Sequence, residues 1–266
     1  MSYTRAAVVA VVAAGLALAG CSTTTTDQPP TTSASVQPSA PASQASSAPA
    51  TTDTPTPTPT ETPTPDLPNA ATLWKNARTA STQQETVKVV GKLVEDDVPM
   101  TITVAGTMDG RNSTLTVTSG ELSYTGLTVA GKGYVKGNAA FWKNSGADDA
   151  TAKKMASKWV ASTQTNTEFT PKALLDGMFS EDLNWLSSAS VRVERTTLDG
   201  KPAILLADRG TGKGTGQIWM TDDPDKPLPL KLSGTDDDGS PLDFTFTEWN
   251  EVKPVKAPPA DQIIQP

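Results

Sequence analysis

The sequence predicts an α+β domain in which short helices cover one face of an antiparallel β-sheet. Three segments alternate apolar and polar residues with a period of two, which is typical of strands with one buried and one solvated face. They are MTITVAGTM from Met100, TLTVT from Thr114 and LDFTFTEW from Leu242. Helical segments lie between the first and last groups of strands, and this order favours helices packed on one face of the sheet.

The turns between the predicted strands carry their own signal. Asp-Gly pairs begin at Asp109, Asp199 and Asp238, each next to a predicted strand. Asp-Gly readily adopts the positive φ angles that type I′ hairpin turns require. We therefore predict that consecutive strands pair directly through such turns.

The first two predicted helices are recognised by their polarity. The segment NAATLWKNARTAS from Asn69 would place Leu73, Trp74 and Ala77 on one side of a helix. The segment DDATAKKMASKW from Asp148 has acidic residues first and lysines last, which matches the helix dipole.

The third helical segment is TPKALLDGMFSEDLNWL, and it carries two start signals. Thr170 is an N-cap residue and Pro171 stands at the first helical position. A second helix is predicted from Ser180, whose next two residues are acidic, and it would run through Leu183 and Leu186.

Residues 1–20 predict a lipoprotein signal peptide. Arg5 precedes a run of Ala, Val, Leu and Gly that is shorter than the roughly 20 residues of a membrane-spanning helix, and the run fits a signal-peptide core. Cys21, the single cysteine of the chain, closes the sequence LAGC. This sequence resembles the bacterial lipobox, in which the thiol receives a diacylglyceryl group. We predict a lipidated Cys21 whose acyl chains hold the protein on the extracytoplasmic face of the cell membrane; the alternative is an ordinary cleaved signal with an incidental cysteine.

Residues 21–68 predict a disordered tether, and residues 69–266 a single globular domain. The tether is rich in Thr, Pro and Ser and ends in TPTPTPTETPTP, so it has too little apolar surface to offset its ordering entropy. It is interpreted either as a semi-rigid spacer that crosses much of a cell wall or as a loose tether of unimportant composition. Its threonines are also candidate O-glycosylation sites.

Charge and composition exclude several classes of function. The formal net charge is −7, and without Arg5 the chain has 21 basic and 29 acidic residues. This balance does not suit nucleic acid, and it does not predict electrostatic docking on anionic lipid headgroups. The chain has no histidine, which removes Ser-His-Asp and Cys-His catalysis and the commonest metal ligand.

We expect no enzyme activity, cofactor or metal, although catalysis by two carboxylates alone stays an open alternative. The segment RGTGKGTG (209–216) lacks the spacing of a phosphate-binding loop. The aspartate-rich segments TDDPDKP (221–227) and GTDDDGSP (234–241) lack the spacing of a calcium loop, and we interpret them as solvated turns.

The C-terminal third carries a resemblance to a known family. The segments TTLDGKPAILL, GQIWMTDDPDKPLPLKLS and FTFTEWNEVKPVKAPPADQII resemble the end of actinobacterial lipoproteins of the LprG/LppX type, which in turn resemble the LolA/LolB lipoprotein carriers. Shorter matches are LWKNARTA and GYVKGNAAFWK. The chain departs from the family in its long tether and in the polar segment NSGADDATAKKMASK, where mycobacterial members have long apolar helices.

This resemblance implies a strongly curved antiparallel sheet, an open half-barrel, with short helices on its concave face. It also implies a cavity for the acyl chains of a lipid or glycolipid, and no catalytic residue. We accordingly expect a membrane-anchored carrier or sensor of such a ligand. The alternative is a non-catalytic envelope module that binds a protein or polysaccharide through exposed tryptophans such as Trp142, Trp219 and Trp249.

The candidate lining residues of the cavity are apolar side chains that recur at helical or strand spacing. The same side chains could instead fill a closed core at normal density, so two interpretations stay open. Met100, Met108 and Met178 would suit a variable ligand, because methionine adapts to irregular surfaces. The set is Ile102, Val104, Leu115, Leu174, Leu175, Met178, Phe179, Leu183, Leu186, Leu230, Leu232, Phe244 and Phe246.

Overall fold

A computed structural model describes residues 66–95, 97–162, 170–179, 191–208, 216–235 and 239–264. Cys21, nearly all of the tether and the predicted helix from Ser180, with Leu183 and Leu186, lie outside the described residues. Within these ranges, no helix combines the length and apolar character needed to cross a membrane.

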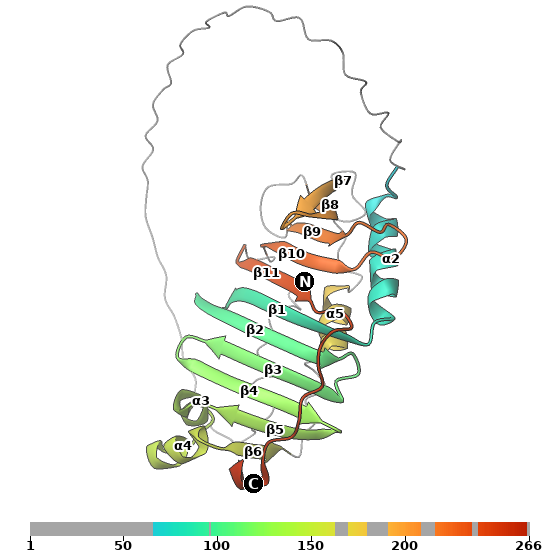
Figure 1. Ribbon diagram of the computed structural model, residues 1–266. Helices are drawn as coiled ribbons and strands as arrows, with labels where there is room; N and C mark the ends of the chain where they lie inside the picture. Colours follow the sequence, from blue (N-terminus) through green and yellow to red (C-terminus); the bar gives the residue numbers. More distant parts are fainter. Residues whose placement is uncertain are drawn as a thin grey trace, which may run out of the picture. The chain divides into compact units, whose positions relative to one another are not determined.

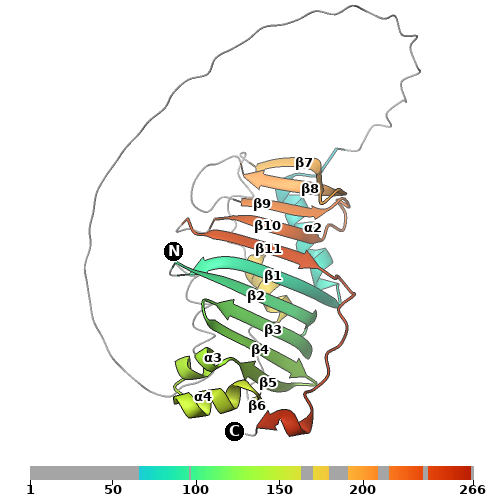
Figure 2. The ribbon, with the colours of Figure 1, turned by 60° about the vertical axis from the view of Figure 1, so that its left-hand side comes forward.

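One open sheet contains all twelve strands of the described residues (Figures 1 and 2). Their order is β12-β6-β5-β4-β3-β2-β1-β11-β10-β9-β8-β7, and β12 and β7 are its two edges. The pairs are antiparallel except for β12 with β6. The strands are β1 Thr86–Glu95, β2 Val98–Thr107, β3 Asn112–Ser119, β4 Leu122–Val129, β5 Lys132–Gly137, β6 Trp159–Ser162, β7 Val191–Leu198, β8 Lys201–Asp208, β9 Gly216–Thr221, β10 Pro229–Thr235, β11 Pro241–Thr247 and β12 Ile263–Ile264.

Short helices cover one face of this sheet, so the predicted fold class is confirmed. Figure 2 shows α2 and α5 behind the strands. The helices are α2 Ala70–Thr82, α3 Ala139–Asn144, α4 Asp149–Ala156 and α5 Pro171–Met178, with a 3₁₀ turn, η3, at Ala260–Gln262. We call the covered side of the sheet the helix face and the opposite side the outer face.

Three of the helices begin directly after a residue whose side chain caps the first turn. The side-chain oxygen of Asn69 accepts a hydrogen bond from the Thr72 amide at 2.9 Å, and Thr170 Oγ1 accepts one from the Ala173 amide at 3.0 Å. Asp148 Oδ1 caps α4 in the same way. These caps satisfy amide groups that have no partner inside the helix, and they confirm the three predicted helix starts.

Consecutive strands pair directly across both described Asp-Gly turns, as predicted, but only one of the two turns is type I′. Asp199 and Gly200 have φ of 50° and 77°, as a type I′ turn between β7 and β8 requires. At Asp109 the connection between β2 and β3 is longer, and positive φ occurs at Gly110 only. There the amide of Arg111 and the hydroxyl of Thr107 donate hydrogen bonds to the Asp109 carboxylate and lower its pKa. Asp238 lies outside the described residues.

The two faces of the sheet differ as the period-two pattern predicts. On the helix face, Val104 lies opposite Val89 and Leu115, while on the outer face Thr103 lies opposite Val90 and Thr116. Strand β8 is an exception, because Ala203 through Ala207 are buried on both faces.

The helix face carries two apolar clusters. The first packs α2 and α5 against β1, β8, β9 and β11. The second packs α3 and α4 against β2, β3 and β4. Leu174 of α5 packs against both clusters, so α5 joins the two halves of the helix face.

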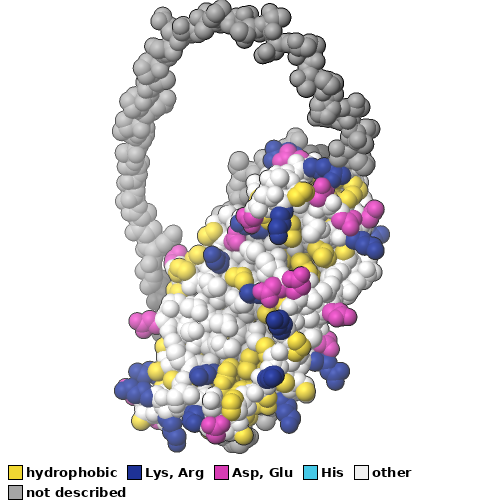
Figure 3. Space-filling model, viewed as in Figure 1, with side chains coloured by type: hydrophobic (Ala, Val, Ile, Leu, Met, Phe, Trp, Pro, Cys, Tyr) yellow, Lys and Arg dark blue, Asp and Glu magenta, His cyan; other side chains and the backbone are white. Residues whose placement is uncertain are grey.

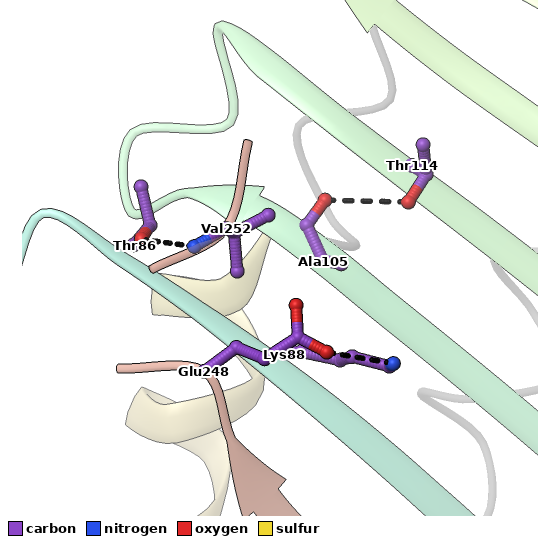
Figure 4. A network of polar contacts seen from close by, with 6 residues as sticks. All are labelled: Thr86, Lys88, Ala105, Thr114, Glu248 and Val252. Carbon is purple, nitrogen blue, oxygen red and sulfur yellow. Dashed lines mark hydrogen bonds and ion pairs between the residues drawn. The ribbon is translucent and has the colours of Figure 1, made fainter. Parts of the chain in front are cut away.

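A C-terminal strap, residues 248–264, runs from the end of β11 to the sheet edge at β6. The side chain of Asn112 holds the middle of the strap. Its Nδ2 donates a hydrogen bond to the Val255 backbone carbonyl at 2.9 Å, and its Oδ1 accepts one from the Val255 backbone amide at 2.8 Å. Figure 4 shows two contacts near the start of the strap: the Lys88–Glu248 ion pair of 2.9 Å and the hydrogen bond that the Val252 amide donates to Thr86. Strand β12 then covers the exposed hydrogen-bonding groups of β6, as edge strands require.

Candidate functional site

Several apolar side chains at the margin of the two clusters are partly exposed, and we call seven of them, from neighbouring strands and α5, the apolar tract. Five come from strands β1, β2, β4, β10 and β11, and two come from α5. All of them pack at the margin of the two buried clusters instead of inside them. The tract consists of Leu93, Met100, Leu122, Leu174, Met178, Leu232 and Phe244.

Strand register brings the sheet members of the tract together. Leu93 of β1 is paired with Met100 of β2, and Phe244 of β11 is paired with Leu232 of β10. Strands β1 and β11 are themselves neighbours, so the two pairs lie side by side. Val98, at the start of β2, is 40% exposed. In the described part of the chain, it is the large apolar residue that is exposed and not only partly so.

Gly91 makes room for the largest side chain of the apolar tract. It is paired with Phe244 across β1 and β11, and a Cβ atom built at Gly91 would lie 2.6 Å from Phe244 Cε1. The phenyl ring therefore occupies the space that a side chain at Gly91 would fill. Any larger residue at this position has to displace the ring.

Six of the eleven predicted lining residues that the structure describes belong to the closed core instead of an accessible surface. Ile102, Val104, Leu115, Leu175, Phe179 and Phe246 are each at most 5% exposed. Four partly exposed members of the predicted set belong to the apolar tract, and they are Leu174, Met178, Leu232 and Phe244. Leu230 lies at an irregularity between Pro229 and Lys231 and joins neither cluster.

Sequence reasoning missed Leu93 and Leu122 as members of the tract. Both stand toward the ends of strands whose alternation the sequence shows only in part. Met108, proposed for a variable ligand, is 9% exposed and packs in the first cluster.

Two polar groups lie within the second cluster. Trp142 is 4% exposed, and its indole N–H is buried without a hydrogen-bond partner. Tyr124 is 7% exposed, and its ring centre lies 4.8 Å from that of Phe141. Burial raises the pKa of Tyr124 to about 12. Tyr124 therefore stays protonated at neutral pH, and an unpaired buried donor such as the Trp142 N–H costs free energy until it finds an acceptor.

The proposed tryptophan surface is wrong as a single patch. Trp142 is buried, and Trp249 stacks on Phe246 while its indole N–H donates to the Pro229 carbonyl at 3.1 Å. Trp219 alone of the three lies on the outer face, with the Lys231 ammonium 5.8 Å from its ring centre. Tertiary packing thus distributes the three indoles over different parts of the sheet.

No group of His, Cys, Asp and Glu side chains that could hold a metal ion occurs in the described part of the chain. Glu194, which follows Val193 on β7, forms an ion pair of 3.1 Å with Arg192 and is not buried.

No protein-family model and no curated protein sequence matches the chain. Among solved structures, LprF from Mycobacterium bovis is similar over 73% of this chain and 99% of its own, at 14% identity and a TM-score of 0.46. An uncharacterised conserved protein from Thermus thermophilus covers 74% of this chain and 99% of its own, at 12% identity and a TM-score of 0.36. A LolA-superfamily protein from Nitrosomonas europaea covers 71% and 95%, at 11% identity and a TM-score of 0.25.

The first and third of these structures come from the groups that the C-terminal motifs resemble. All three TM-scores are below 0.5.

Proposed function

We propose that the domain is a cell-envelope carrier or sensor of a lipid or glycolipid, whose acyl chains bury the apolar tract. The observation that supports this most directly is the tract itself, because its seven apolar side chains stay partly exposed on the face that the helices otherwise cover. A carrier needs apolar surface that is reachable when empty and buried when loaded. A fully closed core would offer none.

The expected binding energy is large enough without any catalytic group. Each buried methylene contributes about 0.8 kcal/mol, so twelve of them contribute about 10 kcal/mol. Part of this offsets the loss of translational freedom and the ordering of the ligand. The adaptable side chains of Met100 and Met178 would let the tract accept chains of different length.

The ligand hypothesis is tested with a matched pair of substitutions on β2. Met100→Glu places a carboxylate in the apolar tract, whereas Thr101→Glu places the same group on the outer face, where Thr101 is exposed. We expect Met100→Glu to weaken binding of a fluorescent fatty-acyl probe at least about tenfold, equivalent to about 1.4 kcal/mol, and Thr101→Glu to leave it unchanged. Titration of the probe and mass spectrometry of co-purifying lipids give the readouts.

Failure of the unsubstituted protein to take up the probe, or equal effects of the two substitutions, would count against the proposal. Both variants are first compared by urea unfolding. This separates a loss of binding from a loss of fold.

Membrane attachment through Cys21 is a separate part of the proposal. The support is the LAGC sequence at the end of an apolar leader, followed by a tether without apolar surface. We expect Cys21→Ser to abolish incorporation of radiolabelled palmitate in the host cell and to move the protein from the membrane fraction to the soluble fraction. Retention of the label in Cys21→Ser would place the modification elsewhere.

A further inference from the structure

The lysines of this acidic protein are concentrated at one edge of the sheet. Residues 122–162, which form β4, β5, α3, α4 and β6, contain six lysines and two aspartates, whereas the whole chain has a net charge of −7. Figure 3 shows Lys and Arg side chains around this lower end of the molecule. The tertiary structure thus creates a local charge that the composition does not predict.

Four of these lysines have no carboxylate partner among the described residues. Lys143 is paired with Asp149 at 2.7 Å, and Lys158 donates to the Asp261 carbonyl at 2.9 Å. The others lie on β5 and α4, three of them exposed to solvent and Lys136 partly so. We call these four, Lys132, Lys136, Lys153 and Lys154, the basic edge.

Apolar and aromatic side chains lie on the outer face beside the two lysines of β5, whereas Lys153 and Lys154 stand on α4 at the same edge of the sheet. Leu127 of β4 is paired with Tyr134 of β5, and Val129 is paired with Lys132. The ammonium of Lys136 lies 6.0 Å from the ring centre of Trp159. All four apolar or aromatic residues are partly exposed, and Figure 3 shows hydrophobic side chains between the lysines at this end.

This combination has the chemistry of a membrane interface. Trp and Tyr rings are favoured at the level of lipid headgroups, and lysine can lay its apolar stem on the surface while its ammonium contacts the headgroups. An anionic polysaccharide would use the lysines but would gain little from Leu127 and Val129.

Toward the opposite edge, the β9–β10 connection instead carries acidic residues, Asp222, Asp223 and Asp225.

We propose that the basic edge, with the outer-face residues of β4 to β6, docks on an anionic lipid bilayer. The partner is identified by complementary charge and by the interfacial aromatic residues. The surface is separate from the apolar tract and does not require the proposed lipid-carrier function. In a carrier, it would bring the domain to the membrane from which acyl chains are taken.

The test uses the whole chain carrying Cys21→Ser, so that acylation cannot contribute, and phosphatidylcholine vesicles that contain or lack phosphatidylglycerol. The triple variant Lys132→Gln, Lys153→Gln, Lys154→Gln is compared with Lys75→Gln, Lys201→Gln, Lys226→Gln, which removes the same charge from exposed positions elsewhere. We expect the first triple to lower affinity for the anionic vesicles about 100-fold, because each lysine contributes about fivefold, the equivalent of about 1 kcal/mol. The second triple should lower it by less than about fivefold.

Leu127→Ser tests the contribution of apolar contact separately from charge. It should weaken binding to anionic vesicles and leave binding to soluble polyglutamate unchanged. The proposal is overturned if the two triple variants lose the same affinity for anionic vesicles. It is also overturned if the protein binds neutral vesicles as tightly as anionic ones. Binding to polyglutamate as tight as to vesicles, with no effect of Leu127→Ser, assigns the surface to an anionic polymer and overturns it as well. Met100→Glu should leave vesicle binding intact, which separates this result from failure of the lipid-carrier proposal.

Discussion

Phe246→Ala is expected to destabilise the domain by about 3–5 kcal/mol, as phenylalanine truncations in packed cores do. Phe246 is 1% exposed, lies in the first cluster and stacks on Trp249 at 6.3 Å between ring centres. Its removal leaves a cavity under β11, because the paired residue Val89 is held by the strand and cannot move in to fill it. Urea unfolding measures the change in the free energy of unfolding.

Thr247→Ala is the matched control for this substitution. Thr247 is the next residue of β11, lies on the outer face and is exposed. Its truncation should change stability by less than about 0.5 kcal/mol. A loss below about 1 kcal/mol in Phe246→Ala would mean that the first cluster is loosely packed, contrary to its burial.

Gly106→Ala is expected to cost about 3–5 kcal/mol, from backbone strain and overpacking together. Gly106 has φ of 147°, which side-chain-bearing residues rarely adopt, and its added Cβ would lie 2.2 Å from the Asn112 carbonyl oxygen and 2.5 Å from Ser113 Cα. Both obstacles are backbone atoms of β3, so the clash cannot be relieved by a rotamer change. Strands β2 and β3 would have to separate at this end.

Gly131→Ala isolates the contribution of backbone conformation. Gly131 also has a positive φ, 77°, but nothing lies within 4 Å of its added Cβ. We expect this variant to lose about 1 kcal/mol, so that the difference between the two measures the clash with β3. Hydrogen exchange should also become faster at the Val255 amide in Gly106→Ala, because Asn112 holds that amide. Equal losses in the two variants would show that β3 yields to the new methyl group.

The prediction of local structure from the sequence succeeded where the determining residues are close together. The alternation in β2, β3 and β11 reports which face each side chain occupies, and Asn69 and Thr170 cap the helices that they precede. Helix α3 was missed because its six residues are too few to show a helical period. The two-residue turn at Ala130 and Gly131 was missed because alanine rarely adopts the φ of 51° found there.

The candidate site could be predicted only in part. Leu174, Met178, Leu232 and Phe244 are partly exposed, whereas Ile102 and Val104 have the same sequence pattern and are buried. A period of two or 3.6 residues identifies the apolar face of an element. It does not say which part of that face another element covers.

The sequence by itself determined the strands with alternating residues, the capped helix starts, the single cysteine at position 21 and the lack of histidine chemistry. These properties depend on residue identity or on neighbours within a few positions. Only the tertiary structure decided which apolar side chains stay exposed beside α5, and that lysines of β5 and α4 gather at one edge of an acidic protein. Exposure and local potential depend on groups that are distant in the chain, and the pairing of strands and the packing of helices bring those groups together.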